Sequence, residues 1–273
     1  MKKLFRYFGG KFYLMDDIQA VFDVIKNKIT CVVDVFGGSG TVLLNLKTHS
    51  KCIKIYNDID SRLYKVMIAL KDEKEIEKLK KEYFLTLRSR EYFEYLKNKN
   101  ENELTVFEIL YLIANSFGGG MKTFGYEISS KRDTYAVTFN NIFKNYVYIR
   151  DWIIENLDFR DLIKKYDSET TFFYLDPPYL EGGKKYKHSF TIEDFKDLKN
   201  ILDGIKGYYL LNESERDFEE IIKIFGEPRL TKEYTNHIII DRKNTRNKRK
   251  EGFWTNFDVK NMTMQDITLL CYE

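Results

Sequence analysis

The sequence predicts an α/β fold in which a mainly parallel sheet alternates with helices and is interrupted by a mainly helical insertion. Two short apolar runs near the start of the chain are each followed by a turn and a helical pattern. The middle of the chain is helical and rich in charge, and the alternation of strands and helices resumes after it. At 273 residues the chain can bury one large core, so we expect one main domain, residues 1–60 and 145–273, with an insertion at 61–144.

The first half of the sheet is expected from two strand–turn–helix patterns. A β-branched run at 30–36 leads into the glycines of 37–40 and a helix-compatible run at 41–46. A second strand at 52–56 ends at Asn57-Asp58-Ile59-Asp60 and precedes a helix at 61–70. Strands that alternate with helices need right-handed crossovers, which predict a parallel sheet.

The middle and the second half are read in the same way. A helical pattern over 72–115 breaks at Gly118-Gly119-Gly120, and a polar, strand-like stretch follows through Phe143. A strand at 171–175 leads to Asp176-Pro177-Pro178-Tyr179, and Thr191 with Asp194 forms a capping box that opens a helix. Further along we expect a strand at 208–211, a helix at 214–225, and a closing antiparallel pair of 234–240 with 267–272.

Composition excludes several classes of protein. Hydrophobic residues make up 43% and aromatic residues 16%, which indicates a packed globular protein. Cys31, Cys52 and Cys271 are odd in number and far apart, so neither a disulfide framework nor a zinc cluster is indicated and no metal is expected. Because no run reaches transmembrane length and polar residues interrupt any apolar signal core, we expect a cytoplasmic protein with no membrane partner.

The distribution of charge says more about partners than the net charge of +3. Six positive charges stand within nine residues: Arg242, Lys243, Arg246, Lys248, Arg249 and Lys250. A second basic group comprises Lys184, Lys185, Lys187 and His188. Such clusters can neutralise phosphates, and the alternative is that they form solvated loops.

The glycine turn stands where doubly wound folds bind ligands, at the carboxyl end of a strand. Leu43 occupies the third glycine position of the dinucleotide fingerprint, and no Gly-Lys-Ser/Thr ending is present, so both phosphate-binding interpretations are weakened. A tight connection without a ligand is the alternative. Asp58, at the tip of the second strand, can accept hydrogen bonds from ribose hydroxyls or cap the next helix. Together, the turn and Asp58 favour a nucleoside ligand.

The strongest local pattern is Asp176-Pro177-Pro178-Tyr179. Two prolines fix the backbone beyond a strand end, and with it the direction of the Asp176 carboxylate and the Pro177 carbonyl, which both accept hydrogen bonds. Two acceptors on an aromatic amine would favour the pyramidal geometry that the nitrogen needs for attack. The Tyr179 ring could stack on a base. A rigid strand-end turn is the alternative.

These segments resemble the Dam-type (alpha-group) DNA N6-adenine methyltransferases. The segment Arg6-Tyr7-Phe8-Gly9-Gly10-Lys11 is similar to the Lys-Trp-Ala-Gly-Gly-Lys motif, with Tyr7 in place of tryptophan. Residues 34–40 fit the Phe-x-Gly-x-Gly motif, Asp58 matches the ribose-binding acid, and residues 176–179 match the catalytic tetrad. Asp158-Phe159 and Ser189-Phe190-Thr191 are weaker matches.

The resemblance implies a Rossmann-like S-adenosylmethionine-dependent methyltransferase fold whose insertion is a target-recognition domain. It implies site-specific methyl transfer to N6 of a flipped-out adenine in duplex DNA, with a restriction endonuclease as a possible companion. The implied catalytic residues are Asp176, Pro177, Pro178 and Tyr179. The implied cofactor-binding residues are Tyr7, Gly10, Lys11, Asp34, Phe36, Gly38, Gly40, Asp58, Asp158, Phe159 and Asp176.

The middle region departs from the family pattern. Relatives that recognise GATC carry an Asn-Gly-Leu turn where this chain has Asn115-Ser116-Phe117-Gly118-Gly119-Gly120, which leaves the recognition sequence open. From residue type, the candidate DNA-binding residues are Lys122, Lys131, Arg132, Asn140, Arg246, Lys248 and Arg249. An enzyme of the same chemistry that acts on RNA is one alternative, and a catalytically silent DNA-binding regulator is another.

Overall fold

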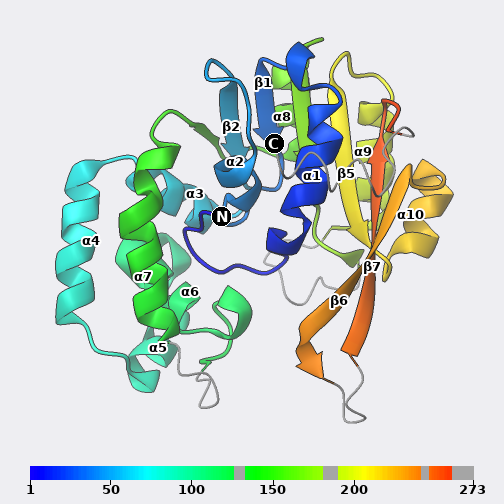
Figure 1. Cartoon of the computed structure of the whole chain (residues 1–273). Helices are drawn as coiled ribbons and strands as arrows, with labels where there is room; N and C mark the ends of the chain where they lie inside the picture. Colours follow the sequence, from blue (N-terminus) through cyan, green and yellow to red (C-terminus); the bar gives the residue numbers. More distant parts are fainter. Residues whose placement is uncertain (126–132, 181–189, 241–245, 260–273) are drawn as a thin grey trace. The chain divides into compact units, whose positions relative to one another are not determined.

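The computed structural model describes residues 1–125, 133–180, 190–240 and 246–259 (Figure 1). The chain divides into two compact units, which are described separately below. Unit 1 comprises residues 1–15, 37–47 and 53–157, and unit 2 comprises residues 16–36, 48–52 and 158–273. The described strands form a seven-stranded sheet in the order β3-β2-β1-β4-β5-β7-β6.

The strand pairings confirm a mainly parallel sheet with an antiparallel edge. In unit 1, β2 (Ile53–Asn57) pairs in parallel with β3 (Ile153–Glu155). In unit 2, β4 (Thr171–Leu175) pairs in parallel with both β1 (Cys31–Asp34) and β5 (Tyr208–Ser214). All five residues of β4 are buried, as expected for a central strand of a parallel sheet covered on both faces.

Unit 1 contains a helical bundle built around α6 (Val106–Ala114). Eight of the nine residues of α6 are buried, and Glu108, which completes a capping box with Thr105, is the exception. The neighbours of α6 are α3 (Ser61–Ala69), α4 (Glu73–Leu85), α5 (Arg90–Lys97) and α7 (Thr134–Asn145). The helical pattern predicted over 72–115 is therefore confirmed, whereas the proposed insertion bounds stay a prediction.

The polar, strand-like interpretation that ran through Phe143 is wrong at its C-terminal end. Residues 134–145 form α7, whose first turn is capped by the Asp133 carboxylate through the Tyr135 N–H at 3.0 Å. Tyr135, Phe139 and Ile142 follow helical spacing and are buried. Asn140 is exposed and Asn141 partly exposed, but the polar Thr138 is buried with the apolar residues, which masked the periodicity.

Helices of unit 2 pack on its part of the sheet. From α1 (Met15–Asp23), Phe22 contacts Phe172 of β4 with ring centroids 5.1 Å apart. The other helices are α8 (Phe159–Tyr166), α9 (Ile192–Leu202) and α10 (Phe218–Phe225), with α9 next to both α8 and α10. The predicted capping box is confirmed, because the Thr191 and Asp194 side chains and backbone N–H groups bond reciprocally at 2.9 and 3.2 Å.

One expectation for the C-terminal part needs correction, and a second stays a prediction. First, β5 continues to Ser214, so the predicted helix begins at Phe218 instead of Ser214. Second, β6 (Leu230–Ile240) pairs with β7 (Arg246–Thr255), which lies between β5 and β6. Residues 267–272, the predicted partner, lie outside the described residues.

The sequence had indicated a loop or phosphate-binding segment at the N-terminal half of β7. Residues 251–255 pair with β5, and residues 251–253 also pair with β6, whereas residues 246–250 pair, among the described strands, with β6 alone. This part of β6 and β7 extends past β5 as a two-stranded ribbon (Figure 1). The positively charged segment at 246–250 is therefore part of a strand and not a loop.

Candidate functional site

The glycine turn after β1 is shaped by contacts that require the absence of side chains. Gly38 and Gly40 have φ values of 52° and 69°, in the left-handed region that glycine favours. A Cβ on Gly37 would lie 2.3 Å from Cε2 of Tyr56. The Gly37 N–H donates to the Asn57 carbonyl at 2.7 Å, and the Tyr56 hydroxyl donates to the Gly38 carbonyl at 2.8 Å. The turn is therefore fitted tightly against the end of β2, and the predicted strand–turn–helix is confirmed by α2 (Thr41–Asn45).

Asp58 follows β2 directly and is joined to the glycine turn. Its Oδ2 accepts the Gly38 N–H at 2.9 Å, and its Oδ1 accepts the Asp60 N–H at 2.8 Å. Burial of the carboxyl raises the pKa of Asp58 to about 6, although these two hydrogen bonds act to lower it. The alternative role of helix cap belongs to Asp60, whose side chain accepts the Arg62 N–H at the start of α3.

The N-terminal motif lies beside the same turn. A Cβ on Gly38 would meet Cδ1 of Tyr7 at 3.4 Å, so the tyrosine ring lies in van der Waals range of the turn. Gly10 donates its N–H to the Tyr7 carbonyl at 3.3 Å, and Lys11 is buried, with 2% of its surface exposed. Unit 1 thus brings together three of the predicted cofactor-binding residues, Tyr7, Gly38 and Asp58.

A second feature of the N-terminal motif was missed by the sequence analysis. Phe8 lies between Gly118 and Gly120, where added Cβ atoms would come within 2.5 and 1.8 Å of its two ring edges. A Cβ on Gly119 would lie 2.1 Å from the Arg6 carbonyl oxygen. The glycine triplet that replaces the family's usual turn is therefore a slot for this aromatic ring. The sequence indicated a break at the triplet but carried no sign of its partner.

Unit 2 holds an aromatic cluster that includes two of the predicted cofactor-binding residues, Phe36 and Phe159. Phe36, which is partly exposed, lies with its ring centroid 6.0 Å from Phe159 and 5.5 Å from Phe190. Asp158 caps α8 by accepting the Arg160 N–H at 2.9 Å and also pairs with the Arg160 guanidinium. Asp34, at the end of β1, is 2% exposed. Ser189 lies outside the described residues.

The tetrad begins immediately after the buried strand β4. Pro177 is buried, whereas Asp176, Pro178 and Tyr179 are partly exposed, which suits groups that must meet a substrate. The next residue, Leu180, donates its N–H to Oδ2 of Asp217 at 3.1 Å, and Asp217 is 3% exposed. The sequence analysis did not identify Asp217, which precedes α10 and helps to fix the exit from the tetrad. The placement of the tetrad against the residues of unit 1 stays a prediction.

The DNA-binding candidates have different structural settings. Lys122 is exposed near the bridge between Ser116 and Phe124, and Asn140 is exposed on α7, a helix and not the expected strand. Lys131 and Arg132 lie outside the described residues. Three further candidates are residues of strand β7: Arg246, Lys248 and Arg249.

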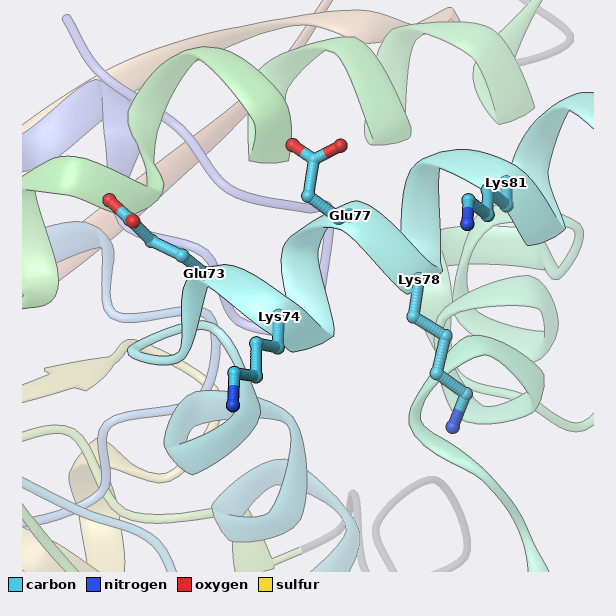
Figure 2. A pocket seen from close by; sticks show the side chains of 5 residues that line it. All are labelled: Glu73, Lys74, Glu77, Lys78 and Lys81. Carbon is cyan, nitrogen blue, oxygen red and sulfur yellow. The ribbon is translucent and has the colours of Figure 1, made fainter.

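One surface hollow lies apart from all predicted site residues. It is lined by Glu73, Lys74, Glu77, Lys78 and Lys81, which all belong to α4. Figure 2 shows Glu73 and Glu77 on one side of the helix and Lys74 and Lys78 on the other, so no polar groups converge. Glu73 pairs with Arg150 and Glu77 with Lys80, as usual on a solvated helix face.

The α/β fold, the glycine turn beside a strand-end acid and the strand-end Asp-Pro-Pro-Tyr segment are compatible with the methyltransferase class of enzymes. Residues 7–238 match the family described as D12 class N6 adenine-specific DNA methyltransferase. The chain belongs to this family, and the protein is an adenine-specific DNA methyltransferase that acts on DNA. In the part of the chain that the structure describes, no helix is both long and apolar enough to cross a membrane.

Proposed function

We propose that the protein transfers the methyl group of S-adenosylmethionine to N6 of an adenine that is flipped out of duplex DNA at a specific sequence. The observation that carries this proposal is the hydrogen bond from the Gly38 N–H to the Asp58 carboxylate, 2.9 Å long. It joins the glycine turn to the strand-end acid, the two elements that a nucleoside cofactor needs. Membership in the family supports the reaction and the acceptor base.

The residues of unit 1 fit the ribose and methionine portions of this cofactor. Each Asp58 oxygen accepts one backbone N–H and has a second lone pair for a ribose hydroxyl. Gly38 presents backbone without a side chain, and the Tyr7 ring borders it. We assign Gly10, Lys11 and Gly40 to the same site. When bound, the cofactor supplies a methyl group that its sulfonium already activates, so the protein must chiefly orient the reactants.

The residues of unit 2 fit the adenine portion of the cofactor. Phe36 is partly exposed and can offer a ring face, whereas Phe159 is buried and has the Arg160 guanidinium over its ring. Phe190 packs edge-on against Phe36 at an interplanar angle of 88°. Asp158 is held by the Arg160 guanidinium, which also bonds Asp194 at 2.7 Å. Asp34 completes the proposed set on this side. The cluster is apolar with one fixed carboxylate, a usual composition for a site that binds a planar base.

The tetrad would act on the target amine. We assign the Asp176 carboxylate and the Pro177 carbonyl to the two N–H bonds of the adenine amine, and the Tyr179 ring to stacking on the base. These hydrogen bonds would increase the electron density on the nitrogen, and acceptors placed for a pyramidal amine would oppose delocalisation of its lone pair into the ring. The amine nitrogen would then attack the methyl carbon while the methyl–sulfur bond breaks and S-adenosylhomocysteine leaves, and the amine proton would pass to Asp176 or to solvent. Pro178 fixes the backbone that holds these groups.

DNA would be bound through polar groups of unit 1 and the basic ribbon of unit 2. We assign base or backbone contacts to Lys122, Lys131, Arg132 and Asn140 within a target-recognition region, and phosphate contacts to Arg246, Lys248 and Arg249. A companion restriction endonuclease and a cytoplasmic location stay predictions.

The test is transfer of label from radioactive S-adenosylmethionine to duplex DNA, with ribosomal RNA as the alternative acceptor. Asp176→Ala should lower kcat by on the order of 100-fold or more, since one preorganised polar group aimed at the reacting centre has about this effect. An unfolding midpoint in urea equal to that of the wild type serves as the control for folding. Wild-type rates in Asp176→Ala, or label in RNA and none in DNA, would contradict the proposal.

A further inference from the structure

The carboxylate of Asp58 is oriented by groups on both sides of it. Gly38 and Asp60 each donate an N–H to one of its oxygens, at 2.9 and 2.8 Å. The Asp58 carbonyl accepts the side-chain amide of Asn156 at 2.6 Å. Any shift of the Asp60 backbone therefore moves one of the two donors that aim this carboxylate.

Asp60 is itself held by a two-pronged ion pair. Arg62 places Nε 2.9 Å from Oδ1 of Asp60 and Nη2 2.6 Å from Oδ2, while its backbone N–H donates to Oδ1 at 3.0 Å. Asp60 is 4% exposed and the Arg62 side chain 14% exposed. A buried, bidentate pair of this kind fixes direction as well as distance, which a lysine cannot reproduce.

Arg62 also reaches the connection that leads into α6. Its Nη1 donates to Oε1 of Glu101 at 3.2 Å. Lys65, one turn further along α3, donates to the Leu104 carbonyl at 2.6 Å and so reaches the same connection without touching Asp60. Both cations therefore bond the connection at 101–104, but the ion pair with Asp60, next to Asp58, is made by Arg62.

The charges near Asp58 shift its pKa in opposite directions. Burial has the largest effect and raises the pKa of Asp58; the negative charge of Asp60 raises it further and the positive charge of Arg62 lowers it. Glu101 and Tyr7 are the other titratable groups that act on Arg62. Without Arg62, the positive charge that acts on both Asp60 and Asp58 would be lost.

We propose that Arg62 is a positioning residue for cofactor binding, which holds Asp60 so that the Asp60 N–H aims the Asp58 carboxylate at the ribose. This inference rests on the proposed function, because that function assigns the ribose of the cofactor to Asp58. Arg62 acts through Asp60 and Asp58 and makes no contact with the cofactor itself.

The experiment measures S-adenosylhomocysteine binding by calorimetry between pH 5 and 8.5, with the full-length protein and its Arg62→Gln, Arg62→Lys and Lys65→Gln variants. Arg62→Gln should raise the Kd for S-adenosylhomocysteine about 10-fold at pH 7.5, because loss of one well-oriented hydrogen bond to a charged group has an effect of this order. It should also move the acidic midpoint of binding to higher pH. Its kcat at saturating cofactor should stay within about twofold of wild type, because the tetrad is unchanged.

Arg62→Lys keeps the positive charge but loses the bidentate contact with Asp60. It should therefore keep the wild-type pH midpoint of binding while its Kd is raised. Lys65→Gln should leave Kd and the midpoint unchanged. The inference is overturned if Arg62→Gln binds like wild type, or if Arg62→Gln and Lys65→Gln weaken binding equally with no shift in midpoint. A wild-type protein that binds no S-adenosylhomocysteine would instead overturn the proposed function, and the inference with it.

Discussion

The slot for Phe8 can be tested by adding one methyl group to it. Gly120 has φ −84°, an angle that alanine adopts without strain, so Gly120→Ala changes the space and not the backbone preference. The new Cβ would lie 1.8 Å from Cε2 of Phe8 and 2.6 Å from its Cζ. The ring cannot simply slide away, because Gly118 borders its opposite edge.

The expected magnitude follows from two opposing effects. Overpacking costs about 1–3 kcal/mol, and the loss of chain entropy in the unfolded state returns about 0.4–1 kcal/mol. We therefore expect Gly120→Ala to lower the free energy of unfolding by about 1–2 kcal/mol, measured by urea denaturation. Gly204→Ala is the control, because its added Cβ would meet only the Ile201 carbonyl at an ordinary 3.6 Å.

A double-mutant cycle assigns the loss to the ring. Phe8→Leu shortens the side chain, so Gly120→Ala should cost less in the Phe8→Leu background than in wild type, with a coupling of about 0.5 kcal/mol or more. A Gly120→Ala protein that unfolds at the same urea concentration as Gly204→Ala would refute the slot. Additive effects of Gly120→Ala and Phe8→Leu on the free energy of unfolding would also refute the slot.

Two further predictions concern charge. Asp58 must be ionised to accept two hydroxyls, and its pKa is raised to about 6, so cofactor affinity should be full well above this pH and fall as the pH drops through it, by about 10-fold at pH 5. Calorimetric titration at constant ionic strength measures this fall, and a flat profile between pH 5 and 8 would contradict it. Neutralising Arg246 and Lys248 to Gln should reduce the slope of log K for DNA against log salt by nearly two. The same change at Lys196 and Lys223, which pair with glutamates on α9 and α10, should leave the slope unaltered.

Features with local causes were predictable from the sequence. The glycine turn was predicted because positive φ angles and close packing need residues without side chains. The capping box of α9 was predicted from Thr191 and Asp194, three positions apart, because its hydrogen bonds close within a single turn. Asp58 was identified because a strand end fixes where the next side chain lies.

Features that depend on distant partners were not predictable. Phe8 and Gly120 are separated by most of unit 1, and neither residue type alone predicts a slot. The pairing of β6 with β7 was missed because charges at 246–250 resemble a loop when the neighbouring strand is unknown. For α7, the signal was present in the spacing of Tyr135, Phe139 and Ile142 and was outweighed by the polar residues between them.

The position of α6 has a consequence for how unit 1 opens. Since α3, α4, α5 and α7 all rest on this one helix, none of the four can leave without exposing apolar surface that the others share. Their amide hydrogens should thus exchange with solvent as one cohort, at a common rate. A substitution in α6 would then be tolerated only with compensating substitutions in several of the helices that pack on it.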